Sequence, residues 1–178
     1  YIVNLSGNID HKKKYQSQKV HFNGLKNILK IIDIKNLKLF IQVGSSLEYG
    51  KRKSPQKESF FCKPISHYGK AKYDASNLLK KKLKKFVILR PYQIYGPNQK
   101  TNRLIPMVIN SCLKDETFSC TSGNQLRDFL YVDDFSHLII KIVKRKFFQH
   151  RIYNVGNGSP KKVKDVIKLI LKITERGK

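Results

Sequence analysis

Three short apolar runs divide the first half of the chain. They cover residues 1–7, 39–43 and 86–90, and the first run ends in the small residues Ser6 and Gly7. Continuous runs of this length, rich in Val, Ile, Leu and Phe, are typical of strands that are buried on both faces of a parallel sheet. The pattern therefore predicts three strands of one sheet.

Helical spacing fills the gaps between these runs. Apolar residues recur at intervals of three and four from Val20 to Ile32 and again from Tyr68 to Leu83, and Ser66 is suited to cap the second helix. The order strand, helix, strand favours parallel neighbours that are joined by right-handed crossovers. We therefore predict an α/β fold.

The alternation of apolar runs with helical segments ends at Gly96-Pro97, where a sharp turn leads the chain out of the sheet. An Asp of the pair Asp133-Asp134 is suited to cap the helix that follows it. The elements expected in this part are helices over 103–113, 135–144 and from Ser159-Pro160 onward, an extended piece over 117–120 and a strand over 152–155.

A hydroxyl, a phenol and an ammonium lie where the predicted elements begin or end. Ser45 follows the second strand, and Tyr68 and Lys72 are four residues apart on one face of the next helix. A nearby cation favours the phenolate and brings the Tyr pKa of about 10 closer to neutral pH. This trio is suited to exchange a proton with a sugar or alcohol oxygen. Taken alone, the Tyr-x-x-x-Lys spacing also fits a solvated helix face.

The charge of the chain bears on its partners. The 178 residues include 37 Lys and Arg against 12 Asp and Glu, a formal net charge of +25. This balance suits a polyanion, but the charge is spread along the chain and is mostly Lys, so nucleic acid is not the partner that we expect. A positive field also suits an anionic nucleotide-linked sugar.

Cysteine usage and hydropathy favour the cytoplasm. The three cysteines are odd in number and have no metal-ligand spacing, so we expect reduced thiols and no metal site. No apolar run approaches the ~18 residues that cross a bilayer, so we expect no membrane segment.

Several motifs occur together in the order of a known family. They are Leu5-Ser6-Gly7, Ser45-Ser46-Leu47-Glu48-Tyr49-Gly50, Tyr68 with Lys72, Leu89-Arg90-Pro91 with Tyr95-Gly96-Pro97, Arg127-Asp128-Phe129 with Val132-Asp133-Asp134, and Tyr153-Asn154-Val155-Gly156. Over nearly the whole chain they resemble the extended short-chain dehydrogenase/reductases, the nucleotide-sugar epimerases and dehydratases.

The resemblance implies the later portion of a Rossmann-like, doubly wound parallel sheet with a smaller C-terminal substrate-binding lobe. Residues 1–97 would belong to the NAD-binding domain and residues 98–178 mainly to the substrate lobe, with about 131–155 returning to the first domain. The family's Gly-x-x-Gly-x-x-Gly phosphate loop does not occur in the sequence. We expect this loop and the first βαβ elements upstream of Tyr1, and we expect the chain as given to bind a dinucleotide poorly.

The resemblance also assigns roles by position. The matched catalytic residues are Ser45, Tyr68 and Lys72; the cofactor-binding residues are Leu5, Ser6, Gly7, Tyr68, Lys72 and Tyr92; the substrate-binding residues are Ser46, Gln93 and Arg127. The implied cofactor is NAD, with NADP not excluded. The implied substrate is a nucleotide-diphosphate sugar, and the implied full-length form is a homodimer.

Departures from the family pattern narrow the activity. Leu47 stands where members that eliminate water carry an acid or base, and Glu48 is expected to point to the opposite side of the strand. Gln93 replaces a common Asn, and His21 replaces an Asn that faces the cofactor, so we assign no such contact to His21. We therefore favour an epimerase or a keto-sugar reductase over a dehydratase. The alternatives are a non-catalytic basic protein that binds polyanions and an inactive fragment.

Overall fold

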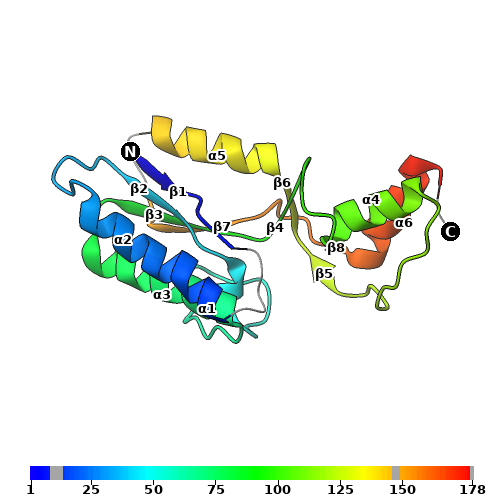
Figure 1. Cartoon of the computed structure of the whole chain (residues 1–178), viewed down its shortest axis with the longest axis horizontal. Coiled ribbons are helices and arrows are strands. Elements are labelled where there is room, and N and C mark those ends of the chain that lie inside the picture. The colour runs from blue at the N-terminus through cyan, green and yellow to red at the C-terminus, as the bar shows by residue number, and fades with distance from the viewer. Residues whose placement is uncertain (9–13, 146–148, 177–178) are drawn as a thin grey trace. The chain divides into compact units, whose positions relative to one another are not determined.

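The computed structural model describes residues 1–8, 14–145 and 149–176, and the chain divides into two compact units. Unit 1 comprises Tyr1–Pro91 and His137–Val155, and unit 2 comprises Tyr92–Ser136 and Gly156–Lys178 (Figure 1). The roles predicted for the two parts of the chain, NAD binding and substrate binding, stay predictions.

A parallel sheet forms the centre of unit 1. Its strands are, in order across the sheet, β1 (Ile2–Asn4), β2 (Phe40–Val43), β3 (Phe86–Pro91) and β7 (Ile152–Val155). All neighbouring strands are parallel, with Val3 beside Ile41 and Ile41 beside Val87. Every residue of β3 is buried, as expected of a strand that is covered on both faces. The predicted α/β fold with a parallel sheet is confirmed.

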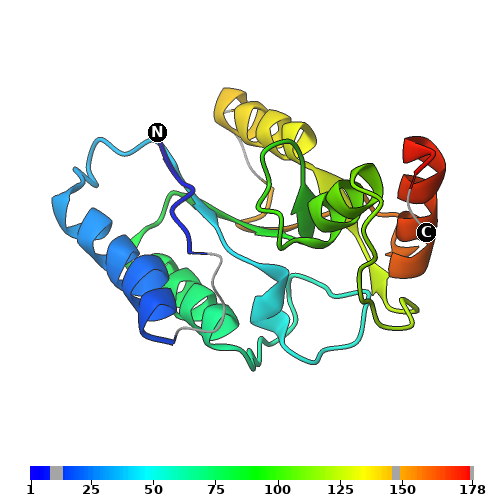
Figure 2. The ribbon, with the colours of Figure 1, turned by 45° about the vertical axis from the view of Figure 1, so that its right-hand side comes forward.

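Helices cover both faces of this sheet (Figures 1 and 2). On one face the consecutive helical segments α1 (Lys14–Ser17), η1 (Gln18–Asn23) and α2 (Gly24–Ile31) lie beside α3 (His67–Lys82). The other face is covered by the part of α5 (Val132–Lys144) that belongs to unit 1. The core between the sheet and the first helix layer includes Leu25, Phe40, Leu79 and Ile88.

Two helices differ from the sequence prediction. The helix predicted over 20–32 contains η1, a π-helical segment, and such segments are often found at functional sites. The prediction that an Asp caps α5 is wrong, because the helix begins at Val132. Asp133 and Asp134 therefore lie in its first turn, where carboxylates interact favourably with the helix dipole.

Unit 2 contains two strand pairs and two packed helices. β4 (Gln93–Tyr95) pairs in parallel with β6 (Phe129–Tyr131), and β5 (Leu126–Arg127) pairs antiparallel with β8 (Lys161–Lys162). α4 (Leu104–Leu113) packs against α6 (Val163–Thr174) through Val108, Cys112 and Ile167. The predicted helix start at Ser159-Pro160 is wrong. Lys161 and Lys162 first pair with β5 as strand β8, and α6 begins at Val163.

The extended piece predicted over 117–120 forms no strand. None of the described helices combines the length and the apolarity that a membrane-crossing segment needs.

Candidate active site

Ser45 lies two residues beyond the carboxyl end of β2, where the chain enters the short helix η2 (Ser46–Tyr49). Its hydroxyl accepts a hydrogen bond from the Leu47 N–H at 3.1 Å, and its own N–H donates to the Glu48 carboxylate at 3.0 Å. This reciprocal pair of bonds is a capping box. It holds the buried Ser45 side chain at the edge of the sheet where parallel folds bind ligands.

α3 brings Tyr68 and Lys72 to the same edge. The Lys72 ammonium donates to the carbonyl of Val43, the last residue of β2, at 2.7 Å. The same Nζ lies 5.9 Å from the centre of the Tyr68 ring, as the i,i+4 spacing predicts. α3 also lies directly against η2, since a Cβ on Gly69 would be 2.6 Å from the Leu47 carbonyl oxygen. The hydroxyl, the phenol and the ammonium thus come from adjoining elements of unit 1.

Burial changes the proton affinity of Lys72, a residue that is only 3% exposed. Loss of hydration lowers the pKa of Lys72 to about 8, and the negative charge of Glu48 acts in the opposite direction. At neutral pH the group is therefore still mostly protonated. A buried ammonium in this state is suited to stabilise a phenolate or to hold a hydroxyl.

A buried ion pair is connected to Ser45. Arg90 on β3 contacts the Glu48 carboxylate through Nε at 3.1 Å and Nη2 at 3.0 Å, and its Nη1 donates to the Tyr49 hydroxyl at 2.9 Å. That hydroxyl donates in turn to the Asn154 side chain on β7 at 2.7 Å. The network ties η2 to two strands of the sheet.

The prediction that Glu48 points to the opposite side of a strand is wrong. Residues 46–49 form η2 instead of a continuation of β2, and this turn directs Glu48 into the interior. The sequence did contain the signal, because Ser followed three residues later by Glu is the capping-box pattern. A second signal was Arg90, a charge at the end of an apolar strand that needs a buried partner.

Leu5, Ser6 and Gly7 follow β1 at the same edge of the sheet. Ser6 donates to the Asn4 side chain through its N–H at 3.1 Å and its hydroxyl at 2.6 Å, and Asn4 donates to Gln42 on β2 at 2.9 Å. Leu5 is 63% exposed and is followed by small residues, so the strand end offers an open apolar surface. These residues fit a nucleotide cofactor that lies across the strand ends.

His21, for which no cofactor contact was predicted, reaches Tyr68 from η1. Its ring is 2% exposed and packs edge-to-face against Tyr68, with ring centres 5.0 Å apart. Its Nε2 lies 3.2 Å from the carbonyl oxygen of Asn8, in the loop after β1. Sequence reasoning missed this contact because the π-helical segment sets the position of the ring.

The other predicted contacts lie at more accessible positions. Ser46 is half-buried at the start of η2 in unit 1. Tyr92, Gln93 and Arg127 belong to unit 2, where Arg127 is exposed and donates to the carbonyl of Leu126 at 2.8 Å. That these three residues approach the groups of unit 1 stays a prediction.

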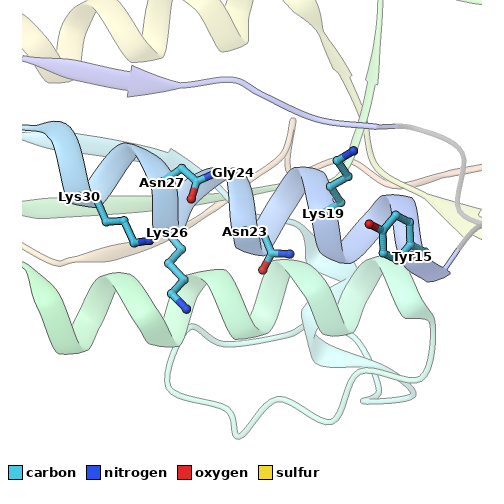
Figure 3. A pocket seen from close by; sticks show the side chains of 7 residues that line it. All are labelled: Tyr15, Lys19, Asn23, Gly24, Lys26, Asn27 and Lys30. Atoms are coloured by element: carbon cyan, nitrogen blue, oxygen red, sulfur yellow. The ribbon is translucent and has the colours of Figure 1, made fainter.

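A hollow of about 500 Å³ lies on the outer face of α1, η1 and α2 (Figure 3). Its lining residues are Tyr15, Lys19, Asn23, Gly24, Lys26, Asn27 and Lys30. All of them except Gly24 are exposed. None belongs to the predicted catalytic, cofactor-binding or substrate-binding sets, so the hollow is a basic surface feature that shares no residue with the predicted site.

Residues 1–156 match the NAD dependent epimerase/dehydratase family. The chain belongs to this family. The matched region includes every predicted site residue, from Leu5 to Arg127. The predicted membership among nucleotide-sugar epimerases and dehydratases, which are enzymes, is confirmed.

Curated relatives have names that denote different reactions on nucleotide-linked sugars. CDP-abequose synthase of Salmonella muenchen is 35% identical over 129 residues, which are 66% of this chain and 44% of the synthase. GDP-6-deoxy-D-talose 4-dehydrogenase of Aggregatibacter actinomycetemcomitans is 26% identical and covers 85% of this chain and 53% of its own length. The chain thus spans about half the length of these curated relatives.

Solved structures share the fold. UDP-glucose 4-epimerase of Thermotoga maritima, solved with UDP-glucose, has a TM-score of 0.85 at 26% identity and covers 98% of this chain and 59% of its own. MoeE5 in complex with UDP-glucose and NAD has a TM-score of 0.87 at 21% identity and covers 98% of this chain and 62% of its own.

Proposed function

We propose that the complete protein is an NAD-dependent nucleotide-sugar epimerase or keto-sugar reductase in which Tyr68 transfers the proton. The observation that carries this proposal is the position of Lys72. Its ammonium lies 5.9 Å from the centre of the Tyr68 ring and is hydrogen-bonded to Val43, two residues before Ser45. A cation in this position favours the phenolate form that the reaction needs.

Tyr68 and Ser45 act together on the hydroxyl that is oxidised, and Lys72 favours the phenolate of Tyr68. The Tyr68 phenolate removes the proton from a sugar hydroxyl, and the Ser45 hydroxyl donates a hydrogen bond to the reacting oxygen. When bound, NAD supplies the acceptor for the hydride that leaves the same carbon. In the reverse direction Tyr68 returns its proton to the carbonyl oxygen, which becomes the hydroxyl again.

Binding falls to residues around this centre. An ammonium has three hydrogens, and the Val43 carbonyl takes one, so Lys72 retains donors for the ribose of the cofactor. Arg127 has the planar fork that suits a diphosphate. The remaining proposed contacts are Leu5, Ser6, Gly7 and Tyr92 to the cofactor and Ser46 and Gln93 to the sugar.

Leu47 and Glu48 argue against water elimination. Leu47 occupies the position of the family's acid or base with an apolar side chain that is 42% exposed. Glu48 is fully buried and paired with Arg90, so it is not available to a substrate. The relation to a sugar 4-dehydrogenase is in keeping with oxidation and reduction at a sugar carbon.

We also propose that the complete protein is a cytoplasmic homodimer, with α3 as the dimer element that the family resemblance suggests. Cys62, Cys112 and Cys120 are free, which suits a reducing compartment. NADP stays an alternative to NAD.

A substrate screen on the native protein tests the proposed activity. We expect reduced-cofactor absorbance to change, or an epimer to form, when NAD or NADP is supplied with one of a set of CDP-, GDP-, UDP- or dTDP-linked sugars and keto-sugars. If the purified protein binds NAD, as measured by calorimetry, but neither signal occurs with any of these sugars, the proposal is wrong.

A further inference from the structure

The Glu48–Arg90 ion pair is almost completely buried beside the predicted catalytic groups. Glu48 is 0% exposed and Arg90 is 1% exposed. Removing two charges from water is so unfavourable that an apolar pair of similar volume often gives an equally stable protein or a more stable one. The position of this pair next to the predicted catalytic groups suggests what else it does.

We propose that Glu48, held by Arg90, is a positioning residue that orients the Ser45 hydroxyl and provides the negative charge that acts on Lys72. This inference rests on the proposed function, since Ser45 and Lys72 are its catalytic residues.

Both oxygens of the Glu48 carboxylate have fixed partners. Oε2 accepts a hydrogen bond from Nε of Arg90 at 3.1 Å and lies 3.0 Å from Nη2 in the salt bridge, and Oε1 accepts the Ser45 N–H at 3.0 Å. Because the two oxygens have partners on different elements, Arg90 and the Ser45 N–H together restrict the orientation of the carboxylate. Arg90 is fixed in turn by the Tyr49 hydroxyl at 2.9 Å. The carboxylate therefore cannot turn away from Ser45 without losing contacts to Arg90.

The backbone before Ser45 leaves space for this carboxylate. A Cβ on Gly44 would collide with Oε1 of Glu48 and would also lie 3.3 Å from the carbonyl oxygen of Leu89. Glycine at this position thus allows the carboxylate to approach the strand end closely. The approach is what brings Oε1 to the N–H of Ser45.

The same capping box determines what the Ser45 hydroxyl is able to do. Its oxygen accepts the N–H of Leu47 at 3.1 Å. A hydroxyl has one hydrogen and two lone pairs. Because η2 engages the oxygen as an acceptor, the hydrogen is left to donate to the reacting oxygen of a substrate. Loss of Glu48 would release the Ser45 backbone and with it this orientation.

The Glu48 carboxylate and the Lys72 ammonium contact the same turn of the chain, since Lys72 donates to the Val43 carbonyl at 2.7 Å and Glu48 accepts the Ser45 N–H at 3.0 Å. Burial lowers the pKa of Lys72, and Glu48 opposes that effect. Without the carboxylate, a larger fraction of Lys72 is neutral at neutral pH and no longer favours the Tyr68 phenolate. Glu48, Arg90 and Lys72 act on one another. The other described charged or titratable groups that act on the ion pair or on Lys72 are Tyr49, Cys62, Tyr68 and Lys80.

The decisive variant replaces both charges, because Glu48→Gln alone would leave Arg90 buried without its carboxylate. In the native protein, E48M/R90M keeps an apolar pair in the same space. The matched control, K70Q/D74N, removes an ion pair at the surface of α3. In the unmodified protein the Lys70 ammonium lies 3.2 Å from the Asp74 carboxylate. Three quantities are compared: the urea midpoint, the pH at which Lys72 becomes reactive to an acylating reagent, and kcat with KM.

We expect E48M/R90M to remain folded, Lys72 to titrate at a lower pH than in the unmodified protein, and kcat to fall roughly tenfold or more with little change in KM. The control should change none of these. A folded E48M/R90M protein with an unchanged Lys72 titration, or with an unchanged kcat, overturns the inference.

A second variant keeps the test independent of the folding of the first. Glu48→Asp retains the negative charge in the same interior but is one methylene shorter and no longer reaches the Ser45 N–H, so kcat should fall while the Lys72 titration stays the same. An unchanged kcat in this variant contradicts the positioning role. If the native protein has no turnover at all, the proposed function fails, and the Lys72 titration in E48M/R90M still decides whether Glu48 acts on that residue.

Discussion

At the scale of single residues, Lys72 shows how function and stability oppose each other. Its ammonium is almost completely buried, and burial lowers its pKa from 10.5 to about 8. Below pH 8 the group is charged in both folded and unfolded protein, so the folded state bears the full desolvation penalty. Between pH 8 and 10.5 the unfolded chain holds more protons, so this group makes stability rise with pH.

Lys72→Met should therefore stabilise the protein while it removes activity. At pH 7 we expect the free energy of unfolding to rise by about 1–3 kcal/mol, which is the desolvation penalty less the hydrogen bond to Val43. The advantage over the unmodified protein should shrink as the pH increases from 8 to 10.5. Urea unfolding at several pH values measures this, with the exposed Lys81→Met on the same helix as the control. A variant that is less stable than the unmodified protein at pH 7 contradicts the argument.

At the scale of elements, the sequence predicted what depends on local periodicity. Continuous apolar runs located β1, β2 and β3, and the four-residue spacing on α3 predicted that Lys72 approaches the Tyr68 ring, although the catalytic roles of both residues stay predictions. Features set by a change of backbone conformation were missed.

The missed features have two causes, local changes of backbone conformation and a long-range strand pairing. Because residues 46–49 form η2 and do not extend β2, the Glu48 side chain points into the interior. The π-helical segment η1 sets the contact between His21 and Tyr68. The start of α6 depends on a strand pairing between β5 and β8, which are far apart in sequence. Such long-range pairings leave no periodic signal in a short window.

The start of α3 was predicted from one residue, and its contribution is measurable. Ser66 accepts the N–H of Gly69 at 3.0 Å, and loss of this cap should destabilise the protein by about 1 kcal/mol in the variant Ser66→Ala. Ser159→Ala, at an exposed position outside the helices, is the control. Equal urea midpoints for the two variants would show that the cap does not stabilise α3.

At the scale of the whole molecule, the proposal assigns proton transfer to unit 1 and part of substrate binding to unit 2. Ser45, Tyr68 and Lys72 all lie in unit 1, whereas Gln93 and Arg127 lie in unit 2. The net charge of +25 gives the chain a positive field, which favours the approach of an anion such as the proposed nucleotide sugar. The sequence predicted the family from motifs in both units, and the family match over residues 1–156 confirms it.

The central claim is that Tyr68 transfers the proton, and turnover in two matched variants of the native protein tests it most directly. Tyr68→Phe removes only the phenol oxygen, so kcat should fall by about 100-fold or more with an unchanged urea midpoint. Tyr73→Phe makes the same chemical change at a half-buried position on the same helix and should leave kcat within about twofold of the unmodified value. A Tyr68→Phe protein that turns over nucleotide sugar as fast as the Tyr73→Phe protein would contradict the account.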